Sequence, residues 1–291
     1  MKKHSITLCF TVVFTFLLSN LLTAQEFKGI ATYQTKTTLK LDNFGGRQLS
    51  EQQKKQIMER MKSSLEKTYT LTFTQSESIY KEDEKLEVTA GGGRGRGFMF
   101  GGGGSSGPVY KNIKDKQLAQ EEEFLGKQFL IQDSLKPIQW KMGSESKQIG
   151  QYLCFKATAS KPVEGFDWQR NRPGSEDENK NVEKVADSTS TNKETEEKEE
   201  TPREIEIVAW YTPQLAVSQG PAEYWGLPGL ILELSADNTT MLCTKIIINP
   251  REVEEIKPLT KGKIVTKEEY NEIMTTKMQE MQEMFRRRRN N

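Results

Sequence analysis

Apolar and polar residues alternate along most of this chain, which is the pattern of half-buried strands. The clearest case is 69–73, where Tyr69, Leu71 and Phe73 alternate with threonines. Gly, Pro and Asp-Ser pairs separate the runs, and short strands at this spacing favour an antiparallel sheet. Besides 68–74, strands are predicted at 26–41, 78–80, 85–90, 109–113, 118–124, 128–132, 138–142, 147–149, 151–159, 205–212, 230–234 and 241–248, the last being the most apolar.

Two segments follow a helical period instead. Ser50 and Gln53 form a capping box, and Ile57, Met58, Met61 and Leu65 then recur on one helix face. The sequence therefore predicts an α+β fold in which a curved, mostly antiparallel sheet, either open or bent into a half-barrel, carries two amphipathic helices. We expect the earlier helix to cover a face of the sheet.

The second helix is predicted over 267–289, behind a capping box that begins at Thr266. Met274, Met278 and Met281 share one of its faces. Thioethers are soft ligands that could hold copper(I), but the same spacing is what a helix needs to pack on a sheet. We favour packing and expect no metal site.

The first 24 residues have the order of a secretory signal peptide: Lys2 and Lys3, an apolar run from Ile6 to Leu22, and a small residue at Ala24. Cleavage would leave residues 25–291 as a single domain in the periplasm, at the outer membrane or outside the cell. No Cys follows the run to carry a lipid anchor, and no later run is long enough to span a bilayer.

Two segments interrupt the strand pattern. Residues 91–107 are rich in Gly and match no phosphate-binding loop, so we interpret them as a flexible hairpin tip. Residues 166–202 carry a net charge of −5 with little to bury, and we interpret them as a disordered acidic insertion.

Composition limits the chemistry. The only histidine is His4, inside the predicted signal, so the remaining chain has neither a Ser-His-Asp nor a Cys-His site, and no histidine to bind zinc or copper. Acid–base chemistry would need carboxylates, Lys, Tyr or Cys. The net charge changes from +1 to −1 when Lys2 and Lys3 are removed, which gives no bias toward nucleic acid. We find no catalytic, cofactor-binding or metal-binding motif.

Two cysteines remain after the predicted cleavage, Cys154 and Cys243, and both stand in strand-like runs. An oxidising compartment would permit a disulfide between them. Two separate buried thiols are the other interpretation, and the sequence does not decide between them.

The segment 209–234 combines aromatic residues with a Pro-Gly turn. Pro228 and Gly229 have the order of a type II turn, in which Gly takes a positive φ. Gly226 would let the backbone pass close to its neighbours. The turn is interpreted either as a core-building corner or as the rim of a binding site. The candidate residues are Trp210, Tyr211, Pro213, Tyr224, Trp225, Gly226, Leu227, Pro228, Gly229, Leu230 and Ile231.

The run Gly226-Leu227-Pro228-Gly229-Leu230-Ile231 resembles the motif that names the GLPGLI family of exported bacterial envelope proteins. The flanks 123–127, 149–154 and 210–213 resemble the family pattern as well. The resemblance implies an envelope protein without an established activity, often encoded beside outer-membrane transport components. It implies no catalytic residues.

We therefore expect a non-enzymatic envelope protein that binds an outer-membrane or periplasmic protein partner or an apolar ligand. A hydrolase that uses carboxylates is the first alternative, and a cleft with two acidic side chains would favour it. A structural or assembly protein without a ligand is the second. A cavity inside the sheet, and the residues that line it, would discriminate among the three.

Overall fold

The computed structural model describes residues 27–39, 49–83, 106–162, 204–252 and 254–290. The predicted signal peptide, nearly all of the Gly-rich segment and the acidic insertion lie outside the described residues. Ser106 and Gly107, which were assigned to the Gly-rich tip, instead begin a strand.

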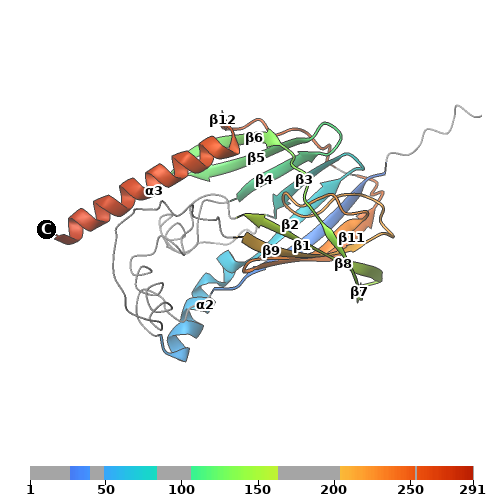
Figure 1. Cartoon of the computed structure of the whole chain (residues 1–291), viewed down its shortest axis with the longest axis horizontal. Helices are drawn as coiled ribbons and strands as arrows, with labels where there is room; N and C mark the ends of the chain where they lie inside the picture. The colour runs from blue at the N-terminus through green and yellow to red at the C-terminus, as the bar shows by residue number, and fades with distance from the viewer. Residues whose placement is uncertain (1–26, 40–48, 84–105, 163–203, 253, 291) are drawn as a thin grey trace, which may run out of the picture.

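The described strands form one open sheet with the order β12-β6-β5-β4-β3-β2-β1-β11-β10-β9-β8-β7 (Figure 1). All neighbours are antiparallel except β12 and β6, which are parallel. The prediction of an α+β fold with a mostly antiparallel sheet is confirmed. The strands are β1 (Gly29–Thr37), β2 (Glu66–Phe73), β3 (Glu77–Glu82), β4 (Ser106–Asn112), β5 (Gln117–Phe124), β6 (Lys127–Ser134), β7 (Lys141–Ile149), β8 (Tyr152–Pro162), β9 (Glu204–Thr212), β10 (Leu230–Ala236), β11 (Thr239–Ile248) and β12 (Lys263–Val265).

The two helices are α2 (Glu51–Leu65) and α3 (Lys267–Asn290), and both predicted capping boxes are present. Their roles differ from the prediction. Leu65 is the only buried residue of α2, so the earlier helix does not cover a sheet face. The later helix packs instead: Tyr270 and Met278 of α3 are buried against β5, β6 and β12. Figure 1 shows α3 running beside β5 and β6 and continuing past them.

The predicted strands between 138 and 149 need correction, and one strand was not predicted. The runs 138–142 and 147–149 are not two strands, because residues 138–140 lie outside any strand and β7 runs from Lys141 through Gly143 to Ile149. The register shifts between Met142 and Ser146, so the glycine marks a bulge rather than a turn. The apolar run 241–248 is β11, but only Cys243 is buried in it. Strand β12 was not predicted because three residues are too short to show a period.

The main core lies on the sheet face that the segment 213–229 crosses. Successive cross-strand partners form one row on this face, from Ala31 through Leu71, Tyr80, Val109 and Gln120 to Ile131. Every member is apolar or aromatic except Gln120. A polar residue in such a row needs a polar neighbour or a cavity beside it.

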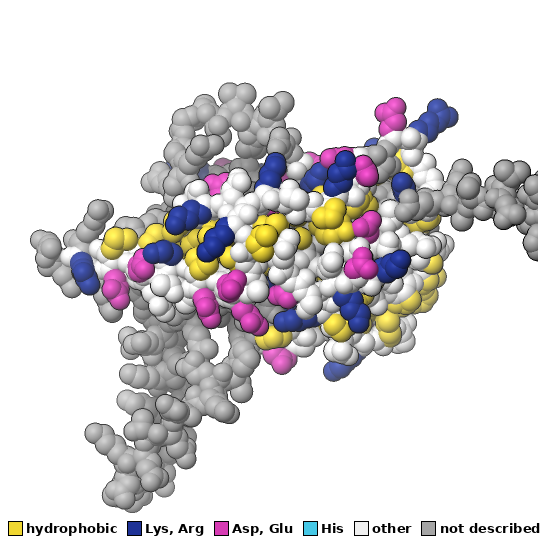
Figure 2. Space-filling view, turned by 90° about the horizontal axis from the view of Figure 1, so that it is seen from above, with side chains coloured by type: hydrophobic (Ala, Val, Ile, Leu, Met, Phe, Trp, Pro, Cys, Tyr) yellow, Lys and Arg dark blue, Asp and Glu magenta, His cyan; other side chains and the backbone are white. Residues whose placement is uncertain are grey.

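The surface formed by α3 and the neighbouring sheet edge carries both hydrophobic and charged side chains. Figure 2 shows hydrophobic side chains in a band with Lys and Arg side chains beside them. Ile264 and Met284 are the most exposed large hydrophobic residues among those described, at 65% and 58%. Among the described residues, no helix combines the length and apolar composition that a bilayer span requires.

Candidate functional site

The segment 213–229 is held across the sheet by backbone hydrogen bonds. The amides of Leu230 and Ile231 donate to the carbonyls of Leu215 and Gln219, at 3.0 and 3.1 Å. The amide of Gly226 donates to the carbonyl of Ser218 at 3.2 Å. Leu227, Leu230 and Ile231 are fully buried, so this part of the motif is a core-building corner.

The two motif glycines have the opposite roles from those predicted. Gly226 has the positive φ, at 94°, and Gly229 does not. The type II turn is therefore wrong. The amide of Gly229 donates to the carbonyl of Leu227 at 2.8 Å, which closes a three-residue turn around Pro228. Gly229 is required by close approach, because a Cβ there would lie 2.1 Å from the carbonyl oxygen of Thr212.

Two tryptophans attach this segment to the chain before β7. The indole Nε1 of Trp140 donates to the carbonyl of Trp225 at 2.8 Å. The indole Nε1 of Trp225 donates to the carbonyl of Lys136 at 3.2 Å. These reciprocal contacts fix residues 136–140 beside the motif and so build one wall of a cavity.

The remaining predicted residues do not gather in one place. Lys147 Nζ lies 4.3 Å from the ring centroid of Trp210, and Tyr211 is buried in the core. Pro213 and Pro228 are exposed. Of the predicted aromatic rim, Tyr224 alone lines a cavity directly.

A lysine lies beneath the loop before the motif. The side chain of Lys111, on β4, is fully buried, and its Nζ donates to the carbonyls of Gly220 at 2.6 Å and Tyr224 at 3.0 Å. Burial lowers the pKa of Lys111 to about 7, although the nearby Glu223 carboxylate acts in the other direction. Lys111 holds residues 220–224 in place.

Glu223 lies between two lysines that come from distant parts of the chain. Its carboxylate accepts hydrogen bonds from Lys161 of β8 at 2.7 Å and from Lys267 of α3 at 3.1 Å. Burial raises the pKa of Glu223, but the ammonium groups of Lys267 and Lys161 lower it by more, to about 2. The carboxylate is therefore ionised throughout the physiological range.

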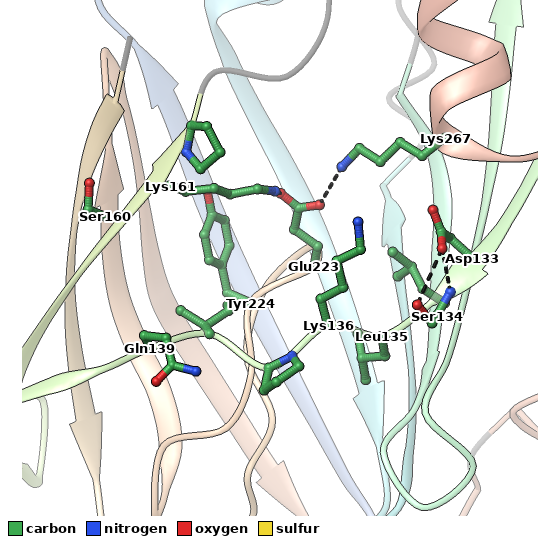
Figure 3. A pocket seen from close by; sticks show the side chains of 14 residues that line it. Asp133, Ser134, Leu135, Lys136, Gln139, Ser160, Lys161, Glu223, Tyr224 and Lys267 are labelled. Carbon is green, nitrogen blue, oxygen red and sulfur yellow. Dashed lines mark hydrogen bonds and ion pairs between the residues drawn. The ribbon is translucent and has the colours of Figure 1, made fainter. Parts of the chain in front are cut away.

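The first cavity, here the lysine cavity, is open on this cluster and has a volume of about 360 Å³. Figure 3 shows Lys136, Lys161 and Lys267 directed toward the space around Glu223. Asp133 and Ser134 lie on its far wall, where the backbone amide of Ser134 donates to the Asp133 carboxylate at 2.6 Å.

The second cavity, here the tyrosine cavity, lies between the sheet row and the start of α3 and also measures about 360 Å³. Tyr69 and Tyr80 stack at a centroid separation of 4.7 Å on the sheet side. Tyr224 and Tyr270 lie across from them. Tyr80 and Thr35 line this cavity, and their buried hydroxyls interact with each other but make no hydrogen bond of normal geometry to a described residue.

Glu122 also lines the tyrosine cavity, next to the polar member of the sheet row. The side-chain amide nitrogen of Gln120, Nε2, donates a hydrogen bond to the Glu122 carboxyl. Burial raises the pKa of Glu122 to about 7, while the contact with Gln120 and the charge of Lys267 act to lower it. Glu122 and Glu223 thus line one cavity with pKa values displaced in opposite directions.

The two cysteines are free, buried thiols that belong to the same core cluster. The disulfide that the sequence left open is not formed in this structure. Burial raises the pKa of Cys154 to about 11 and that of Cys243 to about 12, which disfavours the reactive thiolate. In the described part of the chain, no three His, Cys, Asp or Glu side chains are arranged to hold a metal ion.

Sequence reasoning missed most of the cavity residues. Tyr69 was recognised as a strand residue and Lys267 as part of a capping box, but neither was assigned to a site. A signal was available at Lys111, a charged residue inside the apolar run 109–113. Glu122 and Glu223 carried no comparable signal, because acidic residues are common in this chain.

No curated protein matches the chain. Two solved structures are similar: "Structure of PNGF-II in C2 space group", at 14% identity and a TM-score of 0.43, and "Structure of PNGF-II in P21 space group", at 16% and 0.41. Each alignment covers 85% of this chain and 32% or 33% of the other, so the chain spans about a third of their length. A family model described as "Protein of unknown function (Porph_ging)" matches residues 140–233, which include the Gly226–Ile231 motif.

Proposed function

We propose that this protein is a non-enzymatic, exported envelope protein that holds an apolar ligand in the tyrosine cavity. One observation carries the proposal: a volume of about 360 Å³ between the sheet and α3, lined by four tyrosines, in which the buried hydroxyls of Thr35 and Tyr80 have only each other as a nearby partner. A ligand that contacts the rings and bonds to these hydroxyls would gain both apolar burial and otherwise missing hydrogen bonds.

Export, the GLPGLI relationship and the half-barrel description belong to the same proposal. The signal-like residues 1–24 support export, and the motif at 226–231 supports the family. The half-barrel is supported by strands β1 to β6, each of which contributes at least one residue to the lining of the cavity.

A pair of tryptophan variants on α3 tests the ligand site. Asn271 lines the tyrosine cavity, and the adjacent Glu272 is exposed and does not. We expect wild type to bind the neutral apolar dye N-phenylnaphthylamine, and Asn271→Trp to weaken binding by about ten-fold or more because the indole fills the space. Glu272→Trp is the control and should bind like wild type.

Thermal unfolding of both variants shows whether each has folded. If Asn271→Trp binds the dye as wild type does, the ligand is not in this cavity. If wild type binds no dye and releases no lipid on solvent extraction, the ligand-binding function is overturned.

A hydrolase is the second candidate, because Glu122 and Glu223 line one cavity with oppositely displaced pKa values, a pattern found in acid–base catalysis. The two lysines on Glu223 count against it, since they occupy the carboxylate that would act as nucleophile or base. Chromogenic ester and glycoside substrates test this candidate. Hydrolysis that Glu122→Gln abolishes would support it, and none above buffer would remove it.

The link to an outer-membrane or periplasmic protein rests on the family resemblance alone. Co-purification of one defined envelope protein with the full chain, retained in Asn271→Trp, would favour an adaptor role over ligand carriage.

A further inference from the structure

The two cavities share a wall. Glu223, Tyr224 and Lys267 line both, so a ligand in the tyrosine cavity has one end beside the lysine cavity. The tyrosine cavity, with the stacked rings of Tyr69 and Tyr80, lies on one side of this wall. On the other side, Figure 3 shows the ammonium groups of Lys136, Lys161 and Lys267. The combined space is therefore chemically two-sided, with an apolar part and a cationic part.

Positive charge gathers at the cationic end from several sources. Lys267 is the first residue of α3, where the positive end of the helix dipole adds to its own charge. Lys136 is exposed at the cavity, and no carboxylate in the described parts of the chain pairs with it.

Negative charge at this end comes from Glu223 and Asp133 in the cavity lining, and from Glu268 and Glu269 in the first turn of α3. Glu223 is bonded to Lys161 and Lys267 together. Asp133 accepts from the backbone and side chain of Ser134 on the far wall. Glu122 lies in the tyrosine cavity, where it contacts Gln120. An anionic group that enters beside Lys136 and the α3 N-terminus would meet a favourable potential.

We propose that the ligand is an anionic amphiphile, whose carboxylate or phosphate head binds at Lys136 and Lys267 while its apolar body lies against the tyrosines. This inference rests on the proposed function and names the ligand class of that site. It also gives the two cavities different roles. The tyrosine cavity sets the affinity for the apolar body, and the lysine cavity selects the charge of the head group.

Displacement of the bound dye by three compounds of equal chain length tests the inference. Dodecanoate and dodecyl phosphate carry anionic heads, and dodecanol is the neutral reference. We expect both anions, or one of them, to displace the dye at lower concentration than dodecanol, and the stronger of the two identifies the head group. Added salt should weaken the anions and leave dodecanol unchanged.

Charge variants at Lys136 test whether the anionic head group binds at this residue. The side chain of Lys136 is exposed, and its contact with Trp225 is made by the backbone carbonyl, which a substitution keeps. Lys136→Gln should therefore fold normally and weaken the anions by roughly 2- to 5-fold, with Lys136→Glu weakening them further. Dodecanol should bind all variants alike. Lys141, an exposed lysine on β7 outside both cavities, is the control, and Lys141→Gln should have no effect.

The outcomes separate the two proposals. Equal displacement by dodecanol and the anions, or anion binding that Lys136→Glu does not change, overturns the anionic head and leaves apolar binding intact. Failure of all three compounds to displace the dye, or of the dye to bind, overturns the ligand-binding function and this inference with it.

Discussion

Gly226 and Gly229 illustrate how two identical residues in one short motif answer different physical demands. At Gly226 the demand is conformational, since its φ of 94° disfavours any side chain while the nearest atom to an added Cβ, Trp140 Nε1, is 3.7 Å away. At Gly229 the demand is spatial, since a Cβ added there would lie 2.1 Å from the carbonyl oxygen of Thr212 on strand β9.

Alanine at each position separates these demands. We expect Gly226→Ala to cost about 1–2 kcal/mol of unfolding free energy, the penalty for a left-handed non-glycine residue. Gly229→Ala should cost more, about 3 kcal/mol or above, because β9 and the turn must move apart. Urea denaturation of the two variants measures both values, and equal costs would contradict the close approach at Gly229.

Lys111 is a buried charged residue whose role is to position a loop. Its ammonium would be costly to bury without partners, and the two carbonyls that it bonds reduce this cost. The carbonyls belong to the loop that carries Glu223 and Tyr224, so one buried side chain positions the wall between the cavities.

The two helices begin in the same way and contribute differently. Each has a capping box, at Ser50 and at Thr266. Helix α2 buries only Leu65, whereas α3 contributes Tyr270 and Met278 to a core with Phe124 and Phe129. Capping stabilises a helix locally, but packing transmits that effect to the whole fold.

Matched cap deletions test this difference. Thr266→Ala should lower the global unfolding free energy by about 1 kcal/mol, because α3 is part of the core. Ser50→Ala should leave global unfolding nearly unchanged and increase hydrogen exchange only in the first turn of α2. A global loss as large for Ser50→Ala as for Thr266→Ala would show that α2 is packed as firmly as α3.

At the scale of the whole molecule, Glu223 joins three distant parts of the chain, because its loop is tied to β8 through Lys161 and to α3 through Lys267. Its folded-state pKa, about 2, lies below the ordinary value of 4.5. Between these values the unfolded chain binds more protons than the folded one, so stability rises with pH across this window. The contribution is present above 4.5 and is lost as the pH falls toward 2.

We therefore expect Glu223→Gln to be less stable than wild type at neutral pH, by on the order of 3 kcal/mol, and to show a flatter dependence below pH 4.5. Glu122 titrates in the opposite direction between 4.5 and about 7, so the comparison is made below that range. Glu145→Gln, which breaks the exposed pair with Lys156, is the control and should change little. If the unfolding free energies of wild type and Glu223→Gln fell equally steeply with decreasing pH below 4.5, the ion-pair assignment would be contradicted.

Local sequence determined much of the fold. Period-two runs placed most of the strands, and the Ser50 and Thr266 capping boxes placed both helix starts. Each of these signals acts over a few neighbouring residues, through side-chain alternation or through one cap and the amides beside it. The interruption at Gly143 was misread because a turn and a bulge both use glycine, and only the partner strand distinguishes them.

Tertiary structure alone decided the sites. Tyr69, Tyr80, Tyr224 and Tyr270 come from two strands, a loop and a helix, and share a cavity only because strand order brings them together. The sequence determined that a Pro-Gly corner and an antiparallel sheet would be present, and that no histidine follows His4. Contacts between residues far apart in the chain decide which helix packs on the sheet, which glycine adopts a positive φ and which carboxylate is bonded to two lysines. No local sequence pattern records those contacts.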